Sequence, residues 1–170
     1  MKLSLAILLF CSCYSLVAQD KWKNIYSSHA WAERDKWQKA DALIGLLNIS
    51  SGSQVADVGC HEGYMTFKLA SVVGARGAVY AVDLSESKLE KVRKRADENQ
   101  LTQVKIVKGA PDNPKLPSDI LDAVIILDTF HEMDDPAEIL QHIKTSLKPG
   151  GRLLIADPIA DSRRKQSRSE

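Results

Sequence analysis

The sequence predicts an α/β domain with a doubly wound, mostly parallel sheet. Short apolar runs alternate along the chain with amphipathic stretches of helical length. The apolar runs are consecutive Val, Ile, Leu and Ala residues, which indicates strands buried on both faces. A glycine-bearing turn at residues 57–63 joins the first strand to a helix. Right-handed crossovers between such strands give a sheet whose ligands bind outside the carboxyl ends of the strands.

The first expected helix lies within residues 27–50 and ends before Gly52. Its apolar residues recur at helical spacing: Trp37, Ala40, Leu43, Ile44 and Leu47. Strand and helix then alternate, with strands at residues 54–59, 78–84, 104–109, 121–128 and 152–158 and helices at residues 64–73, 85–100 and 136–148. Gly74 ends the first of these helices, Ser85 caps the second and Pro136 begins the third. Residues 149–151, Pro-Gly-Gly, are the expected turn before the last strand.

The charge balance excludes one class of partner. Lys+Arg number 23 and Asp+Glu 22 among 170 residues, so the net charge is +1. Such a balance gives no reason to expect nucleic acid or another polyanion as a partner. The basic residues near the end are expected to form a solvated polar tail at residues 159–170: Arg163, Arg164, Lys165 and Arg168.

The first residues have the pattern of a secretory signal peptide. One lysine precedes an apolar stretch from Leu3 to Phe10, and smaller residues lead to Ala18, after which cleavage is expected. Alternatives are an N-terminal helix packed on the domain and a lipid anchor at Cys13. The apolar stretch is shorter than the roughly 20 residues that span a bilayer, so no membrane span is expected in the mature chain. We therefore expect an exported protein, periplasmic or secreted, in which Cys60 is the only thiol.

The turn at residues 57–63 and an acid after the second strand predict a nucleoside-bearing cofactor. Asp83 lies 20 residues after Gly63, where a carboxylate can accept both hydroxyls of a ribose. Asp57 decides between cofactors, because a carboxylate before the first glycine repels a pyrophosphate by about 1 to 4 kcal/mol at 4 Å. S-adenosylmethionine instead carries a sulfonium and an ammonium, which favour the carboxylates expected nearby, Asp57, Glu62 and Asp128.

Four stretches together resemble the successive motifs of class I S-adenosylmethionine-dependent methyltransferases. They are "VADVGCHEGYMTFKLA", "VYAVDLSESKLEKVRKRA", "VKIVKGAPDNPKLP" and "LDAVIILDTFHEMDDPAEILQHIKTSLKPGGRLLIADP", and they span residues 50–158 in order. The resemblance implies a Rossmann-like methyltransferase fold with strand order 3-2-1-4-5. It divides the chain into a signal peptide at 1–18, an N-terminal helical segment at 19–51, an S-adenosylmethionine-binding methyltransferase domain at 52–158 and the polar tail.

The resemblance also implies which residues bind the cofactor. The first loop surrounds the methionine part, Asp83 binds the ribose, the loop from Gly109 to Asp112 lies beside the adenine, and Asp128 lies near the methionine end. The expected cofactor-binding residues are therefore Asp57, Gly59, Cys60, Gly63, Asp83, Leu84, Ala110, Asp112 and Asp128. The residues Trp31, Arg34 and Trp37 resemble the segment that covers the cofactor in related enzymes, with plain helix packing as the alternative.

Two departures from the family pattern stand out. His61 occupies a position that is usually glycine; histidine tolerates positive φ better than most residues, and its ring is expected to project towards the cofactor or its mouth. The family sheet usually continues past the fifth strand with two more strands, which this sequence lacks. We therefore expect the fifth strand to be an exposed edge and the sequence to be a fragment of a longer product, or else a naturally shortened domain.

The loop after the fourth strand supplies the candidate catalytic residues. His131 is the candidate general base with Glu132 beside it, because histidine exchanges a proton near neutral pH. The alternative is a structural role in the loop. Loops after the first and fourth strands are expected to be neighbours, which would gather possible metal ligands: Cys60, His61, Glu62, His131 and Glu132. No metal-binding spacing such as HExxH or paired CxxC accompanies them, so no metal is predicted.

The leading functional hypothesis is an S-adenosylmethionine-dependent methyltransferase acting on a small-molecule acceptor. The loop "DTFHEMDDP" lacks the Asn/Asp-Pro-Pro-Tyr/Phe run that the family uses on amino groups of nucleic-acid bases and glutamine. A second hypothesis is a non-catalytic module that binds S-adenosylmethionine or a partner. A nicotinamide-dependent oxidoreductase is the third, and the charge of Asp57 disfavours it.

Overall fold

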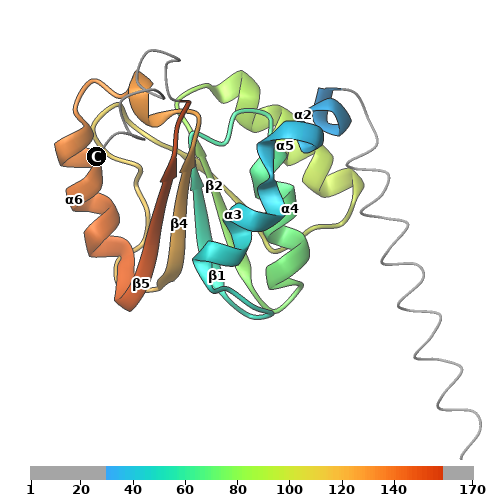
Figure 1. The fold of residues 1–170 in the computed structure, drawn as a ribbon, viewed down its shortest axis with the longest axis horizontal. Helices are drawn as coiled ribbons and strands as arrows, with labels where there is room; N and C mark the ends of the chain where they lie inside the picture. Colours follow the sequence, from blue (N-terminus) through green and yellow to red (C-terminus); the bar gives the residue numbers. More distant parts are fainter. Residues whose placement is uncertain (1–29, 159–170) are drawn as a thin grey trace, which may run out of the picture.

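The computed structural model describes residues 30–158 (Figure 1). The elements follow the chain in the order α2 (Ala30–Gln38), α3 (Ala40–Leu47), β1 (Gln54–Val58), α4 (Tyr64–Val73), β2 (Ala78–Asp83), α5 (Glu86–Glu98), β3 (Val104–Lys108), β4 (Leu121–Leu127), the 3-10 helix η1 (Phe130–Glu132), α6 (Pro136–Ser146) and β5 (Leu147–Ala156). The predicted signal peptide, the alternative lipid anchor at Cys13 and the basic tail lie outside the described residues. Within residues 30–158 no helix has the length and apolarity needed to cross a membrane.

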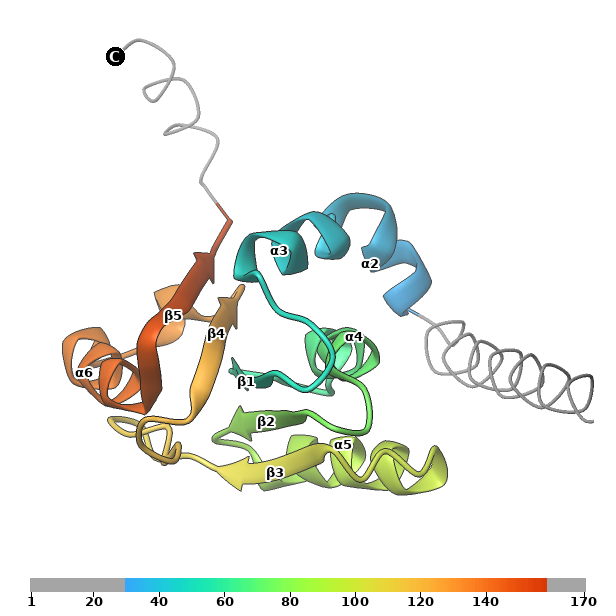
Figure 2. The same ribbon diagram turned by 90° about the horizontal axis from the view of Figure 1, so that it is seen from below.

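The five strands form one parallel sheet in the order β3-β2-β1-β4-β5, as the sequence predicted. Helices α3, α4 and α5 cover one face, and α6 covers the other, where it packs on β4 (Figure 2). Alternate residues of β1 therefore enter different cores: Val55 packs with α3 and α4, whereas Ala56 and Val58 pack on the α6 side. The same alternation directs Asp57 towards α4.

Local sequence signals set most helix ends. Helix α4 ends at Gly74, whose N–H bonds to the Ala70 carbonyl, and α6 begins with Pro136 in its first turn. The Asp135 side chain caps α6 by accepting the N–H of Glu138. Ser85 occupies the N-cap position of α5 as predicted, but its side chain makes no capping hydrogen bond. Its hydroxyl lies 3.0 Å from the hydroxyl of Ser87 instead.

The predicted helix within residues 27–50 is two helices in the structure. Lys39 has a left-handed backbone, with φ 51°, and separates α2 from α3. The break places Ala40, Ile44 and Leu47 in the core but turns Trp37 outward, so that its side chain is 62% exposed. The interpretation of Trp37 as part of the buried stripe was therefore wrong.

The end of the sheet also differs from the prediction. Strand β5 begins at Leu147 and includes the Pro-Gly-Gly residues expected to form a turn, with a register irregularity opposite Leu121 and Ala123. The prediction that the strands are buried on both faces holds for β1 and β4 but fails for the edge strands β3 and β5. Leu153 and Ile155 of β5 are 37% and 38% exposed, because β4 is the one strand that pairs with β5 in the described part of the chain.

Lys39 gives a test of the helix break. Glycine adopts a left-handed backbone without the strain that a Cβ brings, so we expect Lys39→Gly to raise the free energy of unfolding by up to about 1 kcal/mol. The control is Lys36→Gly, inside α2, which should lower it by about 1 kcal/mol. Urea denaturation of both variants measures the difference. A loss of stability for Lys39→Gly would contradict the break.

Candidate functional site

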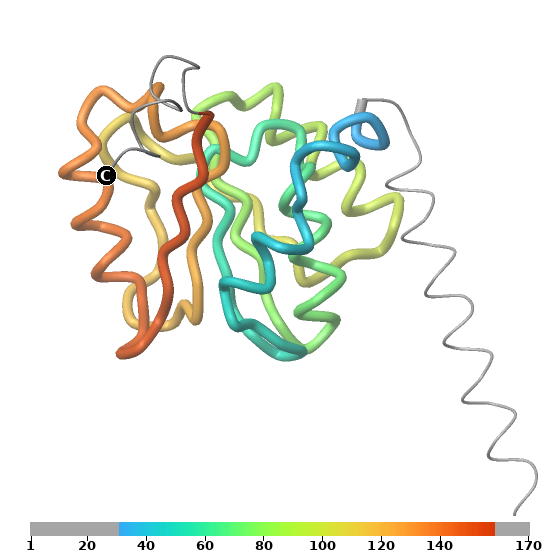
Figure 3. The backbone as a smooth tube through the Cα atoms, in the orientation of Figure 1, coloured from blue at the N-terminus to red at the C-terminus, as the bar shows by residue number. Residues whose placement is uncertain are grey.

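A cavity of about 590 Å³ opens at the carboxyl ends of the strands. The loops after β1, β2, β3 and β4 surround it, and helix α2 closes one side; the tube in Figure 3 shows these loops gathered at the upper edge of the sheet. The predicted site residues that line it are Asp57, Gly59, Cys60, Asp83, Leu84, Ala110, Asp128 and Glu132. Gly63, Asp112 and His131 do not line it. The volume lies within the range of roughly 300–1,000 Å³ typical of small-molecule sites.

The loop after β1 has a left-handed backbone at His61, where the family pattern has a glycine. His61 has φ 49°, and its exposed side chain lines the cavity. Its backbone N–H donates to Asp83 Oδ2 at 2.8 Å, and the N–H of Ser85 donates to Asp83 Oδ1 at 2.8 Å. The histidine is therefore compatible with the turn, as expected, and Asp83 joins the loops after β1 and β2.

The two glycines of this loop are required for different reasons. Gly59 has φ 79°, and a Cβ there would lie 2.7 Å from the Cβ of Thr129, so the loops after β1 and β4 approach closely at the cavity. Gly63 has φ 93° and begins α4, and a Cβ there would lie 2.7 Å from the ring of Phe67. In this structure Gly63 serves helix packing, whereas Gly59 lines the cavity.

Asp57 is a buried carboxylate, only 2% exposed. Thr66 of α4 donates its hydroxyl to Asp57 Oδ2 at 2.6 Å. Burial raises the pKa of Asp57 from 3.8 to about 6, and the bonds from Thr66 and the charge of Arg34 oppose this rise only in part. Asp57 therefore contributes a negative charge to the cavity wall above about pH 6.

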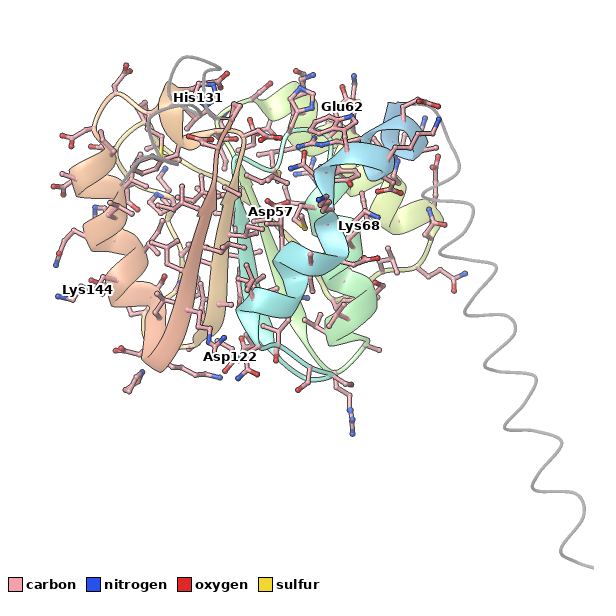
Figure 4. All side chains as sticks on the ribbon, viewed as in Figure 1. Asp57, Glu62, Lys68, Asp122, His131 and Lys144 are labelled. Carbon is pink, nitrogen blue, oxygen red and sulfur yellow. The ribbon has the colours of Figure 1, made fainter. Side chains whose placement is uncertain are left out.

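The expected cluster of five residues at one mouth does not form. Hydrogen bonds from Lys91 and Lys88 hold Glu62 against α5 and lower its pKa to about 2. Figure 4 shows Glu62 far from His131 along the upper edge of the molecule. The interpretation of Glu62 as a carboxylate beside the bound cation was therefore wrong, because Glu62 does not line the cavity and its negative charge is paired with two lysines of α5. Cys60 is buried, and burial raises the pKa of its thiol. Among residues 30–158, no three His, Cys, Asp or Glu side chains lie together as possible metal ligands.

Helix α2 supplies two cavity-lining side chains, Arg34 and Trp37. Arg34 Nη2 lies 2.7 Å from Asp128 Oδ2, and its guanidinium carbon lies 4.3 Å from the ring centroid of Tyr64. Trp31 instead packs edge-on against Tyr64 and beside Phe67, with ring centroids 6.0 Å apart in both pairs. Trp31 thus follows the helix-packing alternative, whereas Arg34 and Trp37 lie at the cavity.

The side chain of His131 is directed towards Asp157. The backbone N–H of His131 donates to Asp157 Oδ2 at 2.8 Å, and the imidazole Nδ1 lies 3.3 Å from Asp157 Oδ1. That oxygen is buried and accepts no hydrogen bond in the described part of the chain, although the imidazole Nδ1 is close enough for a ring rotation to bring it into alignment. Glu132, the partner that the sequence suggested, is more distant, with 3.8 Å between its Oε1 and His131 Nε2.

Sequence reasoning missed Asp157 and did not connect Arg34 to Asp128. A signal for Asp157 exists, since an acid follows β5 just as acids lie at or near the ends of β1, β2 and β4. The pairing of Arg34 with Asp128 joins residues 94 positions apart, and no local pattern indicates it.

Comparison with known proteins places this chain in one family. A family model described as a methyltransferase domain matches residues 49–169. The demethylmenaquinone methyltransferase of Geobacillus sp. (strain WCH70) is 31% identical over 122 residues, which are 72% of this chain and 51% of that protein. The aklanonic acid methyltransferase of Streptomyces sp. (strain C5) is 26% identical over 117 residues, 69% of this chain and 53% of that protein. The chain thus spans about half the length of the curated relatives it matches.

Solved structures agree with the fold. A SAM-dependent methyltransferase from Aquifex aeolicus has a TM-score of 0.65 and 25% identity, over 76% of this chain and 67% of that one. The YcgJ protein of Bacillus subtilis has a TM-score of 0.65 at 19% identity, over 76% of this chain and 55% of that one, and shows likeness of fold alone.

The raised pKa of Asp57 predicts a pH dependence of stability. The folded state binds this proton more tightly than the unfolded state, so its contribution to stability falls as pH rises from about 4 through about 6. The side chain of Asp57→Asn does not titrate, so this variant lacks the dependence. We expect the free energy of unfolding of Asp57→Asn minus that of the native chain to rise by up to about 3 kcal/mol as pH increases across that window. Urea denaturation at pH 4, 5, 6 and 7 measures the difference.

Asp122→Asn is the matched control. Burial opposes ionisation of Asp122 as well, but hydrogen bonds from Lys148 and the Gln54 N–H lower its pKa. The contribution of ionised Asp122 to stability is lost only as pH falls below the ordinary range of a carboxyl group. The difference in free energy of unfolding between Asp122→Asn and the native chain should therefore stay constant from pH 5 to pH 7. If the stability difference changed with pH in the same way for both variants, the raised pKa of Asp57 would be contradicted.

Proposed function

Because the chain belongs to the methyltransferase domain family, we propose that it binds S-adenosylmethionine and transfers the methyl group to a small-molecule acceptor. The observation that carries the proposal is the acidic cavity at the carboxyl ends of the strands. Its lining includes five carboxylates, Asp57, Asp83, Asp128, Glu132 and Asp134, against two cationic side chains, Arg34 and Lys88. S-adenosylmethionine, which supplies an electrophilic methyl group on a sulfonium, has a net positive charge that suits such a lining.

The same charge balance disfavours a dinucleotide. A pyrophosphate needs backbone N–H groups and a helix N-terminus without competing anions. Here the first loop carries the buried carboxylate of Asp57, and the His61 N–H is already bonded to Asp83. A pyrophosphate at this loop would meet a repulsion of about 1 to 4 kcal/mol from a single carboxylate at 4 Å.

Asp83 is suited to bind the ribose of the cofactor. Each of its oxygens accepts one backbone N–H, which leaves about two further lone-pair positions for the two hydroxyls. The loop after β3 adds Ala110, Pro111 and Pro114, and β2 is followed by Leu84, which is 55% exposed at the cavity. These apolar groups offer a surface on which an adenine ring could lie.

The cavity also offers apolar side chains to an acceptor. Trp37 and Met133 line it, and Trp37 is 62% exposed. Exposed aromatic rings at a cavity mouth favour ligands with an apolar body. The names of the relatives, which refer to demethylmenaquinone and to aklanonic acid, support a small-molecule acceptor for this chain as well.

His131 is the proposed general base for acceptors that lose a proton. His131 does not line the cavity, so this role requires its ring to turn towards the acceptor. A neutral imidazole whose Nδ1–H is aligned with Asp157 Oδ1, 3.3 Å away, would have Nε2 available as the acceptor of that proton. The new carbon–acceptor bond forms as the carbon–sulfur bond breaks, the bonding electrons leave with sulfur, and the acceptor proton passes to Nε2. Asp157 is the positioning residue in this arrangement, in place of Glu132.

Ligand binding tests the cofactor proposal. We expect S-adenosylmethionine and S-adenosylhomocysteine, but not NAD, to raise the melting temperature of the full chain, since a ligand of the folded state stabilises it. Asp83→Asn should weaken the binding of S-adenosylhomocysteine at least roughly 10-fold, because hydrogen bonds to a charged group are lost. Asp41→Asn, on the exposed surface of α3, is the control and should bind normally. A shift with NAD alone would overturn the proposal.

Turnover tests the base. The full chain is incubated with methyl-labelled S-adenosylmethionine and a panel of phenols, amines and thiols, and the compound that takes up the label serves as acceptor. We expect His131→Gln to lower kcat roughly 100-fold or more while the binding of S-adenosylhomocysteine is unchanged. Asp157→Asn should lower kcat, whereas Glu132→Gln should affect it less. An equal kcat in His131→Gln and the native chain would contradict the role of His131 as general base. Binding of S-adenosylhomocysteine by a native chain that transfers no methyl group would support the non-catalytic module instead.

A further inference from the structure

We propose that the side chain of His61 sets how strongly the cavity prefers S-adenosylmethionine over its demethylated product, S-adenosylhomocysteine. A neutral imidazole leaves this preference to the carboxylates of the lining, whereas a protonated imidazole lowers the affinity for the ligand that carries the sulfonium charge. The inference rests on the proposed function, because it concerns the same cavity and the same two ligands. It goes beyond that function, since it assigns the discrimination to a residue that stands where the family pattern has a glycine.

The first observation is that His61 brings an ionisable side chain to the cavity wall. The residue is exposed and lines the cavity. Within residues 30–158 its hydrogen bonds use the backbone, as donor to Asp83 and as acceptor from Cys60 Sγ at 3.8 Å, and its ring makes no hydrogen bond or ion pair. Histidine changes its charge between about pH 5 and pH 8. The lining therefore gains a positive charge from His61 in mild acid that it lacks at pH 8.

The second observation is that the backbone of His61 is fixed beside Asp83, the carboxylate proposed to bind the ribose. The N–H of His61 donates to Asp83 Oδ2 at 2.8 Å, and the residue holds a left-handed backbone with φ 49°. The backbone cannot move away from the ribose site without breaking this hydrogen bond. In S-adenosylmethionine one carbon joins the sulfonium to the ribose. A charge on the imidazole and the charge of the sulfonium therefore lie in the same cavity.

The third observation concerns the permanent charges that face His61 from the neighbouring elements. The lining carboxylates come from the ends of β1 and β2 and from the loop after β4: Asp57, Asp83, Asp128, Glu132 and Asp134. The lining cations come from α2 and α5, and each has an acidic partner. Arg34 lies 2.7 Å from Asp128, and Lys88 lies 3.0 Å from Glu62. Among the described residues, His61 is thus the one lining imidazole whose protonation alters this balance.

Asp57 also titrates in this range, because burial raises its pKa to about 6. Its protonation removes a negative charge from the lining, which weakens a cationic ligand as pH falls. The contributions of Asp57 and His61 therefore have the same sign and have to be separated by substitution. The thiol of Cys60 and the phenol of Tyr64 stay neutral, since burial raises the pKa of both.

The size of the effect follows from the dimensions of the cavity. The cube root of its volume of about 590 Å³ is about 8 Å. Repulsion between two unit charges about 8 Å apart corresponds to a roughly 2- to 30-fold loss of affinity, for effective dielectric constants between about 80 and about 20. Because His61 is exposed, we expect a value near the lower end, which falls further in about 1 M salt.

Two ligands that differ by one methyl group and one positive charge test the inference. Isothermal titration calorimetry of the full chain measures the affinities of S-adenosylmethionine and S-adenosylhomocysteine at pH 5, 6, 7 and 8. We expect the dissociation constant of S-adenosylmethionine divided by that of S-adenosylhomocysteine to rise as pH falls. His61→Asn stays neutral and accepts a left-handed backbone, so its rise should be roughly 2- to 30-fold smaller. His61→Gly, which adopts this backbone without strain, should behave in the same way.

Two control variants separate His61 from other titrating groups. Asp57→Asn removes the second titration of the lining and should keep the part of the rise that is due to His61. His142→Gln replaces a histidine of α6 outside the cavity lining, whose Nε2 lies 3.4 Å from Glu138 Oε1, and should show the native rise. The melting temperature of each free variant at each pH reports whether it is folded.

The outcomes are distinct. An equal rise in the native chain and in both His61 variants would overturn the inference, as would a native ratio that does not change with pH. An equal loss of both ligands at every pH in the His61 variants would also overturn it, because the side chain would then act through its shape. Failure of the native chain to bind either ligand would instead contradict the proposed function. A smaller rise in both His61 variants, with a native rise in His142→Gln, supports the inference.

Discussion

The carboxylate of Asp83 joins the two loops on which the cavity depends. It accepts one N–H from His61 in the loop after β1 and one from Ser85 at the start of α5. This contact allows a histidine to hold a left-handed backbone at a position where a glycine would need no support. The first loop keeps its shape as a result, and Gly59 can approach Thr129 of the neighbouring loop closely at the cavity, which both residues line.

A parallel sheet brings the carboxyl ends of its strands to one edge, and the structure gives each acid at that edge a different environment. Asp57 is buried beside Thr66, Asp83 is bonded to backbone, and Asp128 is paired with Arg34. Asp157, outside the cavity lining, lies with its Oδ1 3.3 Å from Nδ1 of the His131 imidazole. Because their partners differ, Asp57, Asp83 and Asp128 can serve different purposes within the cavity that they line, and their collective charge favours a cationic ligand.

The N-terminal helices extend the site beyond the part of the chain that matches the family. Helix α2 contributes Arg34 and Trp37 to the cavity, and polar contacts from Asp35 hold it against α4. The left-handed residue Lys39 makes this arrangement possible, since one straight helix over residues 30–47 could not place α3 in the core and Trp37 at the cavity together. Part of the cavity lining therefore comes from a segment that packs on the sheet domain rather than from the sheet itself.

The resemblance to class I methyltransferases implied the order of the strands, which the structure confirms. The sequence by itself determined the alternation of strands and helices, the approximate ends of most of them, and the edge at which the site lies. Those features depend on local patterns: consecutive apolar residues for β1 and β4, glycine at the end of α4, proline at the start of α6. The site residues Asp57, Gly59, Asp83 and Asp128 follow from the same patterns, because acids and glycines after parallel strands meet at one edge. Only the tertiary structure decided the partners. Arg34 meets Asp128 across 94 positions, His131 meets Asp157 rather than Glu132, and Glu62 is bonded to lysines of α5 instead of facing the cavity. Side-chain partners of this kind depend on which helix faces pack together, and no periodicity in the chain records that.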